Sequence, residues 1–425
     1  MCTGVGVLLF VSNLLGTSPL KFSHAKGKFI VSRKIKQYNV FVAIFLLLTF
    51  ILIVSPTLGL KSNILKYSYV CHLILCGSTA FVSTVYSSVL TQQNIDRLDE
   101  KTLAVSYFLW EERSIKHMYV IPLPCWATSP MIILSALAYG DTVWLFPDSR
   151  ILLLLPLLIA DMIKNTVILQ FIVLNVILQR SFKRLNDSIL KLFGISEELE
   201  LDYYNFDSGS SIQSPESSAT VELYQCNRAK VYWHCRQKNR LFYDSQCHIP
   251  MKVAAVQDIR LQNLRKTHCL LCESSKIINT AYSVQNLLQL VNCFVSTLFL
   301  TYVLFASCVD VKLGLRMQDM LFFVLWIGPN LWRLFSLTYS SEMVVCEASR
   351  TEKLVNRLML SPLMKDYRSC AELQLFAKQF VCCRVSYSAA GFVSFDFRMI
   401  TAFAGTVTTY LVILFQFTLS DVENQ

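Results

Sequence analysis

The chain has 425 residues, of which 54% are hydrophobic and only 16% are charged. This apolar excess is larger than the core of a soluble domain requires, and it indicates lipid as the solvent. The net charge of +10 does not by itself indicate a nucleic-acid partner, because the basic residues are segregated by loop. The sequence therefore predicts an all-α membrane protein that binds no nucleic acid.

Seven apolar runs are long enough to cross a hydrocarbon core of about 30 Å, which takes roughly 20 helical residues. They occupy residues 39–60, 68–90, 119–139, 151–178, 287–309, 320–339 and 399–419. The third run is the weakest, because it contains Pro122 and Pro124. We expect helices 1–4 within residues 39–178, helices 5 and 6 within 287–339, and helix 7 at 399–419.

The orientation follows from the distribution of Lys and Arg. The segments on one side of the predicted membrane carry 32 of the 39 basic residues, and the opposite side carries five. Because basic residues are retained in the cytoplasm, the N-terminal segment 1–38 is expected inside the cell and the tail 420–425 outside. This order is the reverse of that in G-protein-coupled receptors.

The N-terminal stretch VGVLLFVSNLLGTSPL allows two interpretations. It could be the core of a signal peptide, although no basic residue precedes it and no convincing A-x-A cleavage site follows. An amphipathic helix lying on the inner membrane surface fits equally well.

Two long cytoplasmic segments, 179–286 and 340–398, show helical patterning outside the predicted spans. Apolar residues recur at helical spacing at Phe182, Leu185, Ile189 and Leu192, at Ile259, Leu261, Leu264 and Leu271, and at Leu354, Leu358, Leu373, Phe376 and Phe380. These stripes predict a cytoplasmic helical anchor domain below the membrane; separate amphipathic helices resting on lipid are the alternative. The polar stretch 205–219 lies between the first two stripes, within segment 179–286, and is expected to be a disordered linker.

The cysteines favour the same orientation. None of the fifteen lies in the short outer loops, so no disulfide framework is expected. The loop 179–286 gathers cysteines and histidines, and the piece HCLLC, from His268 to Cys272, has a spacing that zinc sites use. A second pair at matching spacing is missing, so we predict ordinary cytosolic thiols and no metal site.

The seventh span carries a polar stripe. Thr401, Gly405, Thr408, Thr409, Gln416 and Ser420 fall on roughly one helical face, with Val412 or Ile413 between them. Polar groups inside a bilayer must face protein or water. Either they hydrogen-bond to neighbouring helices of one subunit, or copies of the helix surround an axis and line an ion pore.

The sequence TYLVILFQF, from Thr409 to Phe417, resembles the C-terminal signature of insect gustatory receptors: a Thr-Tyr pair, five mostly apolar positions and Gln-Phe. The preceding SAAGFVSFDF, residues 388–397, and the early LLFVSNLLGTSPL, residues 8–20, also resemble that family. Chain length, seven spans and inverted topology agree with it over the whole sequence.

The resemblance implies a ligand-gated, nonselective cation channel in the plasma membrane of sensory neurons. It further implies a homotetramer, or a heteromer with other gustatory receptors, in which the last helix lines the pore. Gln416 and Phe417 would lie near the extracellular gate, with Thr409, Tyr410 and Ile413 lower on the helix. The expected partners are a small-molecule tastant, permeating cations and membrane lipids.

The resemblance also implies a ligand pocket between the second and sixth spans, open to the outside. Trp326 and Asn330, one turn apart in the sixth span, are weak candidates for it, as is Asp161 in the fourth span. Asp161 and Lys164 are spaced to pair on one helical face. Arg333 is expected to snorkel to the cytoplasmic surface or to pair with a neighbour.

The ligand class is harder to predict. Sugar-sensing members typically have glutamate directly after Thr-Tyr, whereas this chain has Leu411. We therefore expect a bitter compound, with fructose or another sugar as the alternative.

Two other function classes remain open. A metabotropic receptor lacks support because neither a DRY-like nor an NPxxY-like motif is present, and a solute carrier lacks paired broken helices. No enzyme activity and no cofactor are expected, since no nucleophile, metal or phosphate-binding motif has the right spacing.

Overall fold

The structure is a computed structural model. It describes residues 3–18, 20–23, 28–57, 74–86, 151–193, 251–309, 317–360 and 367–423, with a few single positions between 97 and 136. These residues are helical apart from turns and two short hairpins. The predicted linker 205–219 lies outside the described residues, as does most of the predicted third span.

The N-terminal region folds back onto the helical bundle. Helix α1 (Thr3–Leu14) ends at Gly16, whose φ of +71° is the left-handed conformation that terminates helices. A hairpin of β1 (Leu20–Ser23) and β2 (Lys28–Val31) leads into α2 (Arg33–Thr57). The side chain of Gln170 donates to the hydroxyls of Ser12 and Thr17 at 2.9 and 3.2 Å, so α1 is fixed to another helix of the bundle.

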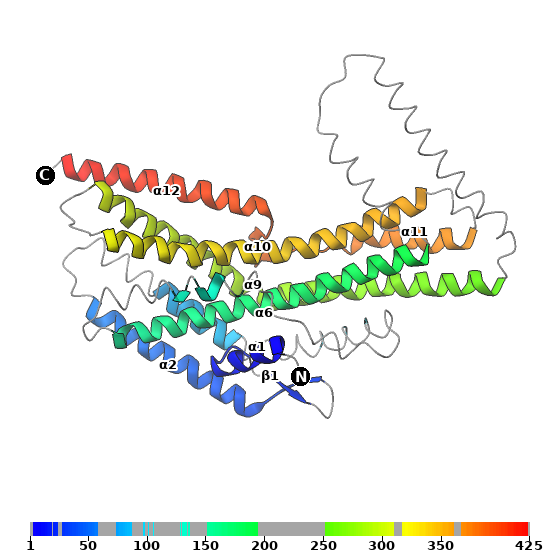
Figure 1. The fold of residues 1–425 in the computed structure, drawn as a ribbon, viewed down its shortest axis with the longest axis horizontal. Helices are drawn as coiled ribbons and strands as arrows, with labels where there is room; N and C mark the ends of the chain where they lie inside the picture. Colours follow the sequence, from blue (N-terminus) through cyan, green and yellow to red (C-terminus); the bar gives the residue numbers. More distant parts are fainter. Residues whose placement is uncertain are drawn as a thin grey trace, which may run out of the picture.

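Three long helices dominate the molecule: α6 (Ile151–Leu192), α9 (Met251–Val309) and α10 (Met317–Leu360). At 1.5 Å per residue they measure about 63, 88 and 66 Å, roughly two to three times a bilayer core of about 30 Å. They pack against one another along the long axis of the molecule (Figure 1). Each therefore has room for one span and a long extension.

Helix α11 (Tyr367–Cys382) lies against α9 and α10, and the short strands β3 (Ser388–Ala389) and β4 (Val393–Ser394) connect it to α12 (Phe397–Glu423). Figure 1 shows α12 along the edge of the bundle, at the end opposite to α11.

Several predicted spans coincide with described helices. Four described stretches are long and apolar enough to cross a membrane: Arg33–Ile51, Leu158–Leu192, Asp258–Phe305 and Phe397–Gln416. In α9 the charged residues end at Lys276, so the part suited to lipid is the second half, where the sequence predicted 287–309. The predicted span 320–339 is helical within α10, and Ile74–Tyr86 is a shorter apolar helix inside the predicted second span. The total of seven membrane spans stays a prediction.

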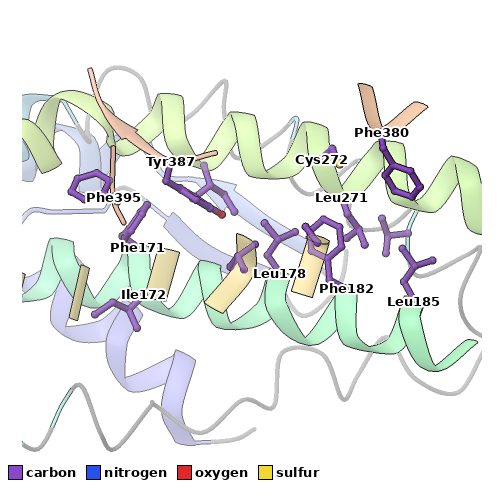
Figure 2. Packing of buried hydrophobic residues seen from close by; sticks show 14 of the residues in the cluster. Phe171, Ile172, Leu178, Phe182, Leu185, Leu271, Cys272, Phe380, Tyr387 and Phe395 are labelled. Carbon is purple, nitrogen blue, oxygen red and sulfur yellow. The ribbon is translucent and has the colours of Figure 1, made fainter. Parts of the chain in front are cut away.

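The apolar stripes outside the spans pack together. We call this region the extension bundle: α6 from 179, α9 up to 286, α10 from 340, and α11. Phe182, Leu185 and Ile189 of α6 are fully buried, and Figure 2 shows Phe182 and Leu185 close to Leu271 of α9 and Phe380 of α11. The predicted stripe members Leu261, Leu264, Leu354, Leu358, Leu373 and Phe376 are buried as well.

One stripe member was predicted wrongly: Ile259 is 58% exposed, because the buried face of α9 begins only at Leu261. The shared core otherwise argues against separate helices resting on lipid. Its cytoplasmic location stays a prediction.

His268 lies in the core of the extension bundle. Its ring makes edge contacts with Phe182, Phe376 and Phe380, with centroids 4.8 to 5.9 Å apart. Burial lowers the pKa of His268 to about 4, so the imidazole is neutral at physiological pH.

Candidate functional site

Helix α12 has one attached face and one open face. Its aromatic residues contact α9: Phe403 and Tyr410 meet Phe294 edge-on at 5.8 and 6.0 Å, and Phe415 meets Phe305 at 5.9 Å. Val407, between these contacts, is buried. The attachment to α9 therefore uses aromatic residues of α12.

The polar stripe occupies the open face. Thr401, Gly405, Thr408, Thr409 and Gln416 are exposed, and a Cβ added at Gly405 would meet nothing within 4 Å. Ile413 is 40% exposed. Within the described part of one chain, these residues do not face another helix. The reading in which they bond to neighbouring helices of the same subunit is not supported by this arrangement.

The threonine hydroxyls bond within α12 itself. Thr406, Thr408 and Thr409 donate to the carbonyl oxygens four residues earlier, at 2.8 to 2.9 Å. Each donor is thus satisfied by the helix, while oxygen lone pairs remain on the outer surface. Such a surface can solvate a cation without leaving an unpaired donor.

The signature residues divide between the two faces. Thr409 and Gln416 are on the open face, whereas Tyr410 is half-exposed with its ring against Phe294 of α9. The side chain of Phe417 lies outside the described side chains. The motif therefore combines residues of the open face with a residue that attaches the helix to α9.

The segment before α12 fixes where the helix begins. Asp396 accepts a hydrogen bond from the backbone N–H of Met399 at 3.0 Å, which is N-capping geometry. The β3–β4 turn contains Ala390 and Gly391 with φ of 50° and 78°. It is held on α9 by the backbone N–H of Ala390, which donates to the hydroxyl of Ser283 at 2.8 Å.

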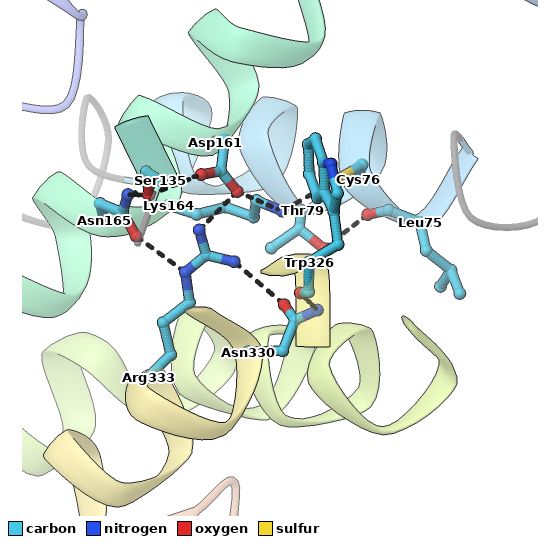
Figure 3. Close-up of polar contacts among 10 residues, drawn as sticks. All are labelled: Leu75, Cys76, Thr79, Ser135, Asp161, Lys164, Asn165, Trp326, Asn330 and Arg333. Atoms are coloured by element: carbon cyan, nitrogen blue, oxygen red, sulfur yellow. Dashed lines mark hydrogen bonds and ion pairs between the residues drawn. The ribbon is translucent and has the colours of Figure 1, made fainter. Parts of the chain in front are cut away.

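A buried charged cluster lies on the opposite side of α9, where α6 and α10 meet. Asp161 and Lys164 of α6 form an ion pair at 3.2 Å, and Arg333 of α10 contacts the same carboxylate oxygen at 2.5 Å. All three side chains are at least 96% buried. Figure 3 shows that they converge from two helices on one point.

The predicted Asp161–Lys164 pair is confirmed, and of the two alternatives expected for Arg333 the structure shows pairing with neighbours and not snorkelling. Its Nε and Nη1 donate to the amide oxygens of Asn165 and Asn330 at 2.7 and 3.0 Å, which holds the guanidinium inside the bundle. Its partners on α6, Asn165 and Asp161, lie 168 and 172 residues away in the sequence, so helical spacing could not identify them.

The cluster also includes residues that the sequence analysis missed. Lys164 contacts the sulfur of Cys76 at 2.8 Å, and Asn165 donates to the hydroxyl of Ser135 at 3.3 Å. Asn165 follows Lys164 directly and lies one turn after Asp161, a spacing that could have indicated it. Cys76 and Ser135 had no sequence signal beyond their location in apolar runs.

The predicted pocket residues Asp161, Trp326 and Asn330 do come together. Asn330 donates to the backbone oxygen of Trp326 at 3.2 Å and accepts from Arg333, so both amide atoms are used (Figure 3). Trp326 is partly buried against a small apolar cluster that contains Leu46, Phe50 and Ile163. Their role in ligand binding stays a prediction.

The cysteine and histidine cluster is only partly described. His268 and Cys272 are 3.6 Å apart on one turn of α9, and burial raises the pKa of Cys272 to about 12, so the thiol stays protonated. Among the described residues, no group of three or more possible metal ligands comes together. Cys269 lies on the same helix, 3.9 Å from Glu273. The remaining cysteines and histidines of the loop lie outside the described residues: Cys226, His234, Cys235, Cys247 and His248.

The sequence of the chain is similar to those of known chemosensory receptors. A family model described as 7tm chemosensory receptor matches residues 5–421. A putative gustatory receptor 28b of Drosophila melanogaster is 24% identical over 172 residues, which cover 39% of this chain and 35% of that relative.

The fold is also similar to that of solved structures. The olfactory receptor OR5 of the insect Machilis hrabei superposes with a TM-score of 0.59 at 12% identity, covering 97% of both chains. The complex of the same receptor with eugenol superposes with a TM-score of 0.57 at 12% identity and the same coverage.

Proposed function

Because the chain belongs to the seven-transmembrane chemosensory receptor family, which includes insect gustatory and olfactory receptors, we propose that it is a tastant-gated, nonselective cation channel whose pore is lined by α12. The observation that carries the proposal is the open face of α12, where Thr401, Gly405, Thr408, Thr409 and Gln416 are exposed. An apolar helix with such a face requires water or a second subunit beside it.

The proposed topology has seven spans, a cytoplasmic N-terminus and an extracellular C-terminus. The excess of basic residues on the predicted inner side supports this orientation. In it, the extension bundle is the cytoplasmic anchor domain, formed by residues 179–286 and 340–398. The charged surface of α9 before Lys276, which is unsuited to lipid, supports the same assignment.

The proposed assembly is a homotetramer, or a heteromer with other gustatory receptors, around the open faces of four α12 helices. The pore would then be lined by Thr409, Ile413 and Gln416, with Phe417 beside the outer gate. The absence of any neighbour around Gly405 among the described residues leaves room for close approach of another helix. The location is the plasma membrane of sensory neurons.

The ligand is proposed to be a small-molecule tastant held between the second, fourth and sixth spans. Asp161, Trp326 and Asn330 contribute there, and their meeting around Arg333 supports this location. A bitter compound is proposed first, because Leu411 replaces the glutamate typical of sugar-sensing receptors. Fructose or another sugar is the second candidate, favoured by the many buried polar side chains of the bundle.

The test is recording from excised outside-out patches in GTP-free solution, with the chain expressed alone and a panel of bitter compounds and sugars applied. We expect ligand-evoked cation current without GTP, and an altered unitary conductance in Gln416→Ala. A matched control is Gln374→Ala, an exposed glutamine of α11, which should leave conductance unchanged. Current that appears in intact cells but vanishes in the GTP-free patch would instead identify a metabotropic receptor.

A further inference from the structure

The charged cluster carries more positive than negative charge. Lys164 and Arg333 are both cations, and Asp161 is the one carboxylate that contacts them among the described residues. With these three groups ionised, the described residues of the cluster hold a net charge of +1 inside an apolar bundle. Burying an unpaired charge costs several kcal/mol unless another group compensates for it.

The cluster also has more hydrogen-bond donors than acceptors. Oδ1 of Asp161 accepts from Lys164 and Arg333, while Oδ2 accepts from Ser135 and Asn165, so both oxygens are occupied. Arg333 has five N–H groups, and its bonds to Asn165, Asn330 and Asp161 account for three of them. Lys164 has three, and its contacts with Asp161 and Cys76 account for two.

A second, independent feature lies on the neighbouring face of α9. Asn286, Gln289 and Asn292 are completely buried, and neither polar atom of any of these side chains has a hydrogen-bond partner among the described residues. A buried polar group without a partner destabilises the folded state, because it has lost its hydrogen bonds to water. Their spacing of three residues places them on one helical face.

This face of α9 borders the charged cluster. Cys293, which follows Asn292 directly, is buried, and α9 packs against both α6 and α10, the two helices that carry the cluster. The face is opposite to the aromatic one, since Phe294 and Phe305 point to α12. Surplus donors and unpartnered amides therefore adjoin in one region between α6, α9 and α10.

We propose that this region is a binding site for a small anion, either inorganic or the carboxylate of an organic ligand. One negative charge would neutralise the cluster and accept from the remaining N–H groups of Lys164 and Arg333. The amides of Gln289 and Asn292 would supply further hydrogen bonds to polar substituents. The inference rests on the proposed function in one respect only: if the ligand is a bitter compound, the site prefers anionic compounds over neutral and cationic ones.

The experiment measures thermal unfolding of the purified full chain with benzoate or benzamide, a pair of similar shape and different charge, at constant ionic strength. Ligands that bind the native state raise the unfolding temperature. We expect benzoate to raise it at concentrations at least tenfold lower than benzamide. Chloride in place of benzoate, at equal concentrations, shows whether an inorganic anion suffices or a carboxylate is required.

The variant Lys164→Gln leaves a neutral Asp161–Arg333 pair, so the preference for benzoate should be lost, whereas Lys164→Arg should keep it. Lys183→Gln, an exposed lysine of α6, is the matched control and should behave like the native chain. If benzoate and benzamide raise the unfolding temperature of the native chain equally, the proposal is overturned, and this result does not depend on any variant. A benzoate preference that persists in folded Lys164→Gln would do so as well.

This binding measurement does not depend on channel opening. Anion binding without any ligand-evoked current would count against the proposed channel and leave the site standing. Current evoked by neutral ligands, together with equal unfolding temperatures in benzoate and benzamide, would support the channel and count against the anion site.

Discussion

Asp161 is the residue on which the buried cluster depends. Its carboxylate contacts Lys164 of its own helix and Arg333 of α10, and it accepts from Asn165 and Ser135 as well. Removing the carboxylate leaves two buried cations without a counterion, whereas removing either cation leaves a neutral pair.

We therefore expect Asp161→Asn to destabilise the protein by about 3–5 kcal/mol, as is usual when one partner of a buried ion pair is deleted. Arg333→Gln should cost less, because Lys164 still neutralises Asp161. The measurement is the unfolding temperature of both purified variants. The double variant Asp161→Asn/Lys164→Gln should recover part of the loss, and a larger loss in Arg333→Gln than in Asp161→Asn would contradict this account.

At this scale the sequence predicts only what is local. The pairing of Asp161 with Lys164 follows from their spacing on a helix. The partner of Arg333 does not, because the contact joins helices more than 160 residues apart and depends on how α6 and α10 pack. Asn330 was predicted as a ligand contact, and the structure shows that its amide already bonds to Arg333 and to the backbone of Trp326.

Among the elements, α12 has the most clearly defined beginning. Asp396 caps its first turn, and the β3–β4 hairpin ties the preceding backbone to α9 through Asn279 and Ser283. The capping residue and the turn glycine belong to the SAAGFVSFDF stretch. The residues of this stretch thus have a structural role, because they determine where the proposed pore helix begins.

Replacing the cap should loosen this start. We expect Asp396→Ala to cost about 1 kcal/mol in the first turn of α12, since the N–H of Met399 loses its acceptor. Hydrogen exchange followed by mass spectrometry should show faster exchange at residues 397–400. Asp396→Asn, which retains a capping oxygen, is the control, and equally fast exchange in both variants would argue against the capping role.

Helical elements were predictable where one face is apolar over several turns. The stripe from Phe182 to Ile189 indicated a buried face outside the membrane, and the structure buries it. Ile259 was misassigned because an apolar stripe does not show where packing between helices ends. The strands β3 and β4 have two residues each, which is too short for an alternating pattern to be recognised in the sequence.

For the molecule as a whole, α12 is a helix attached on one side only. Helices α9 and α10 pack along its attached face, and its opposite face is open along the described side chains from Thr401 to Gln416. The charge distribution predicts the orientation and hydropathy predicts seven spans, and both stay predictions. The central claim is that the open face of α12 lines a cation pore.

The most direct test is modification by a cationic methanethiosulfonate reagent in patches from chains carrying Thr409→Cys or Gly405→Cys. Val407→Cys, on the buried face between them, is the matched control, and the native chain reports any effect on its own cysteines. We predict that the reagent suppresses ligand-evoked current at Thr409→Cys and Gly405→Cys and leaves Val407→Cys unaffected. Unchanged current at both open-face positions, with full modification confirmed, would contradict a pore lined by α12.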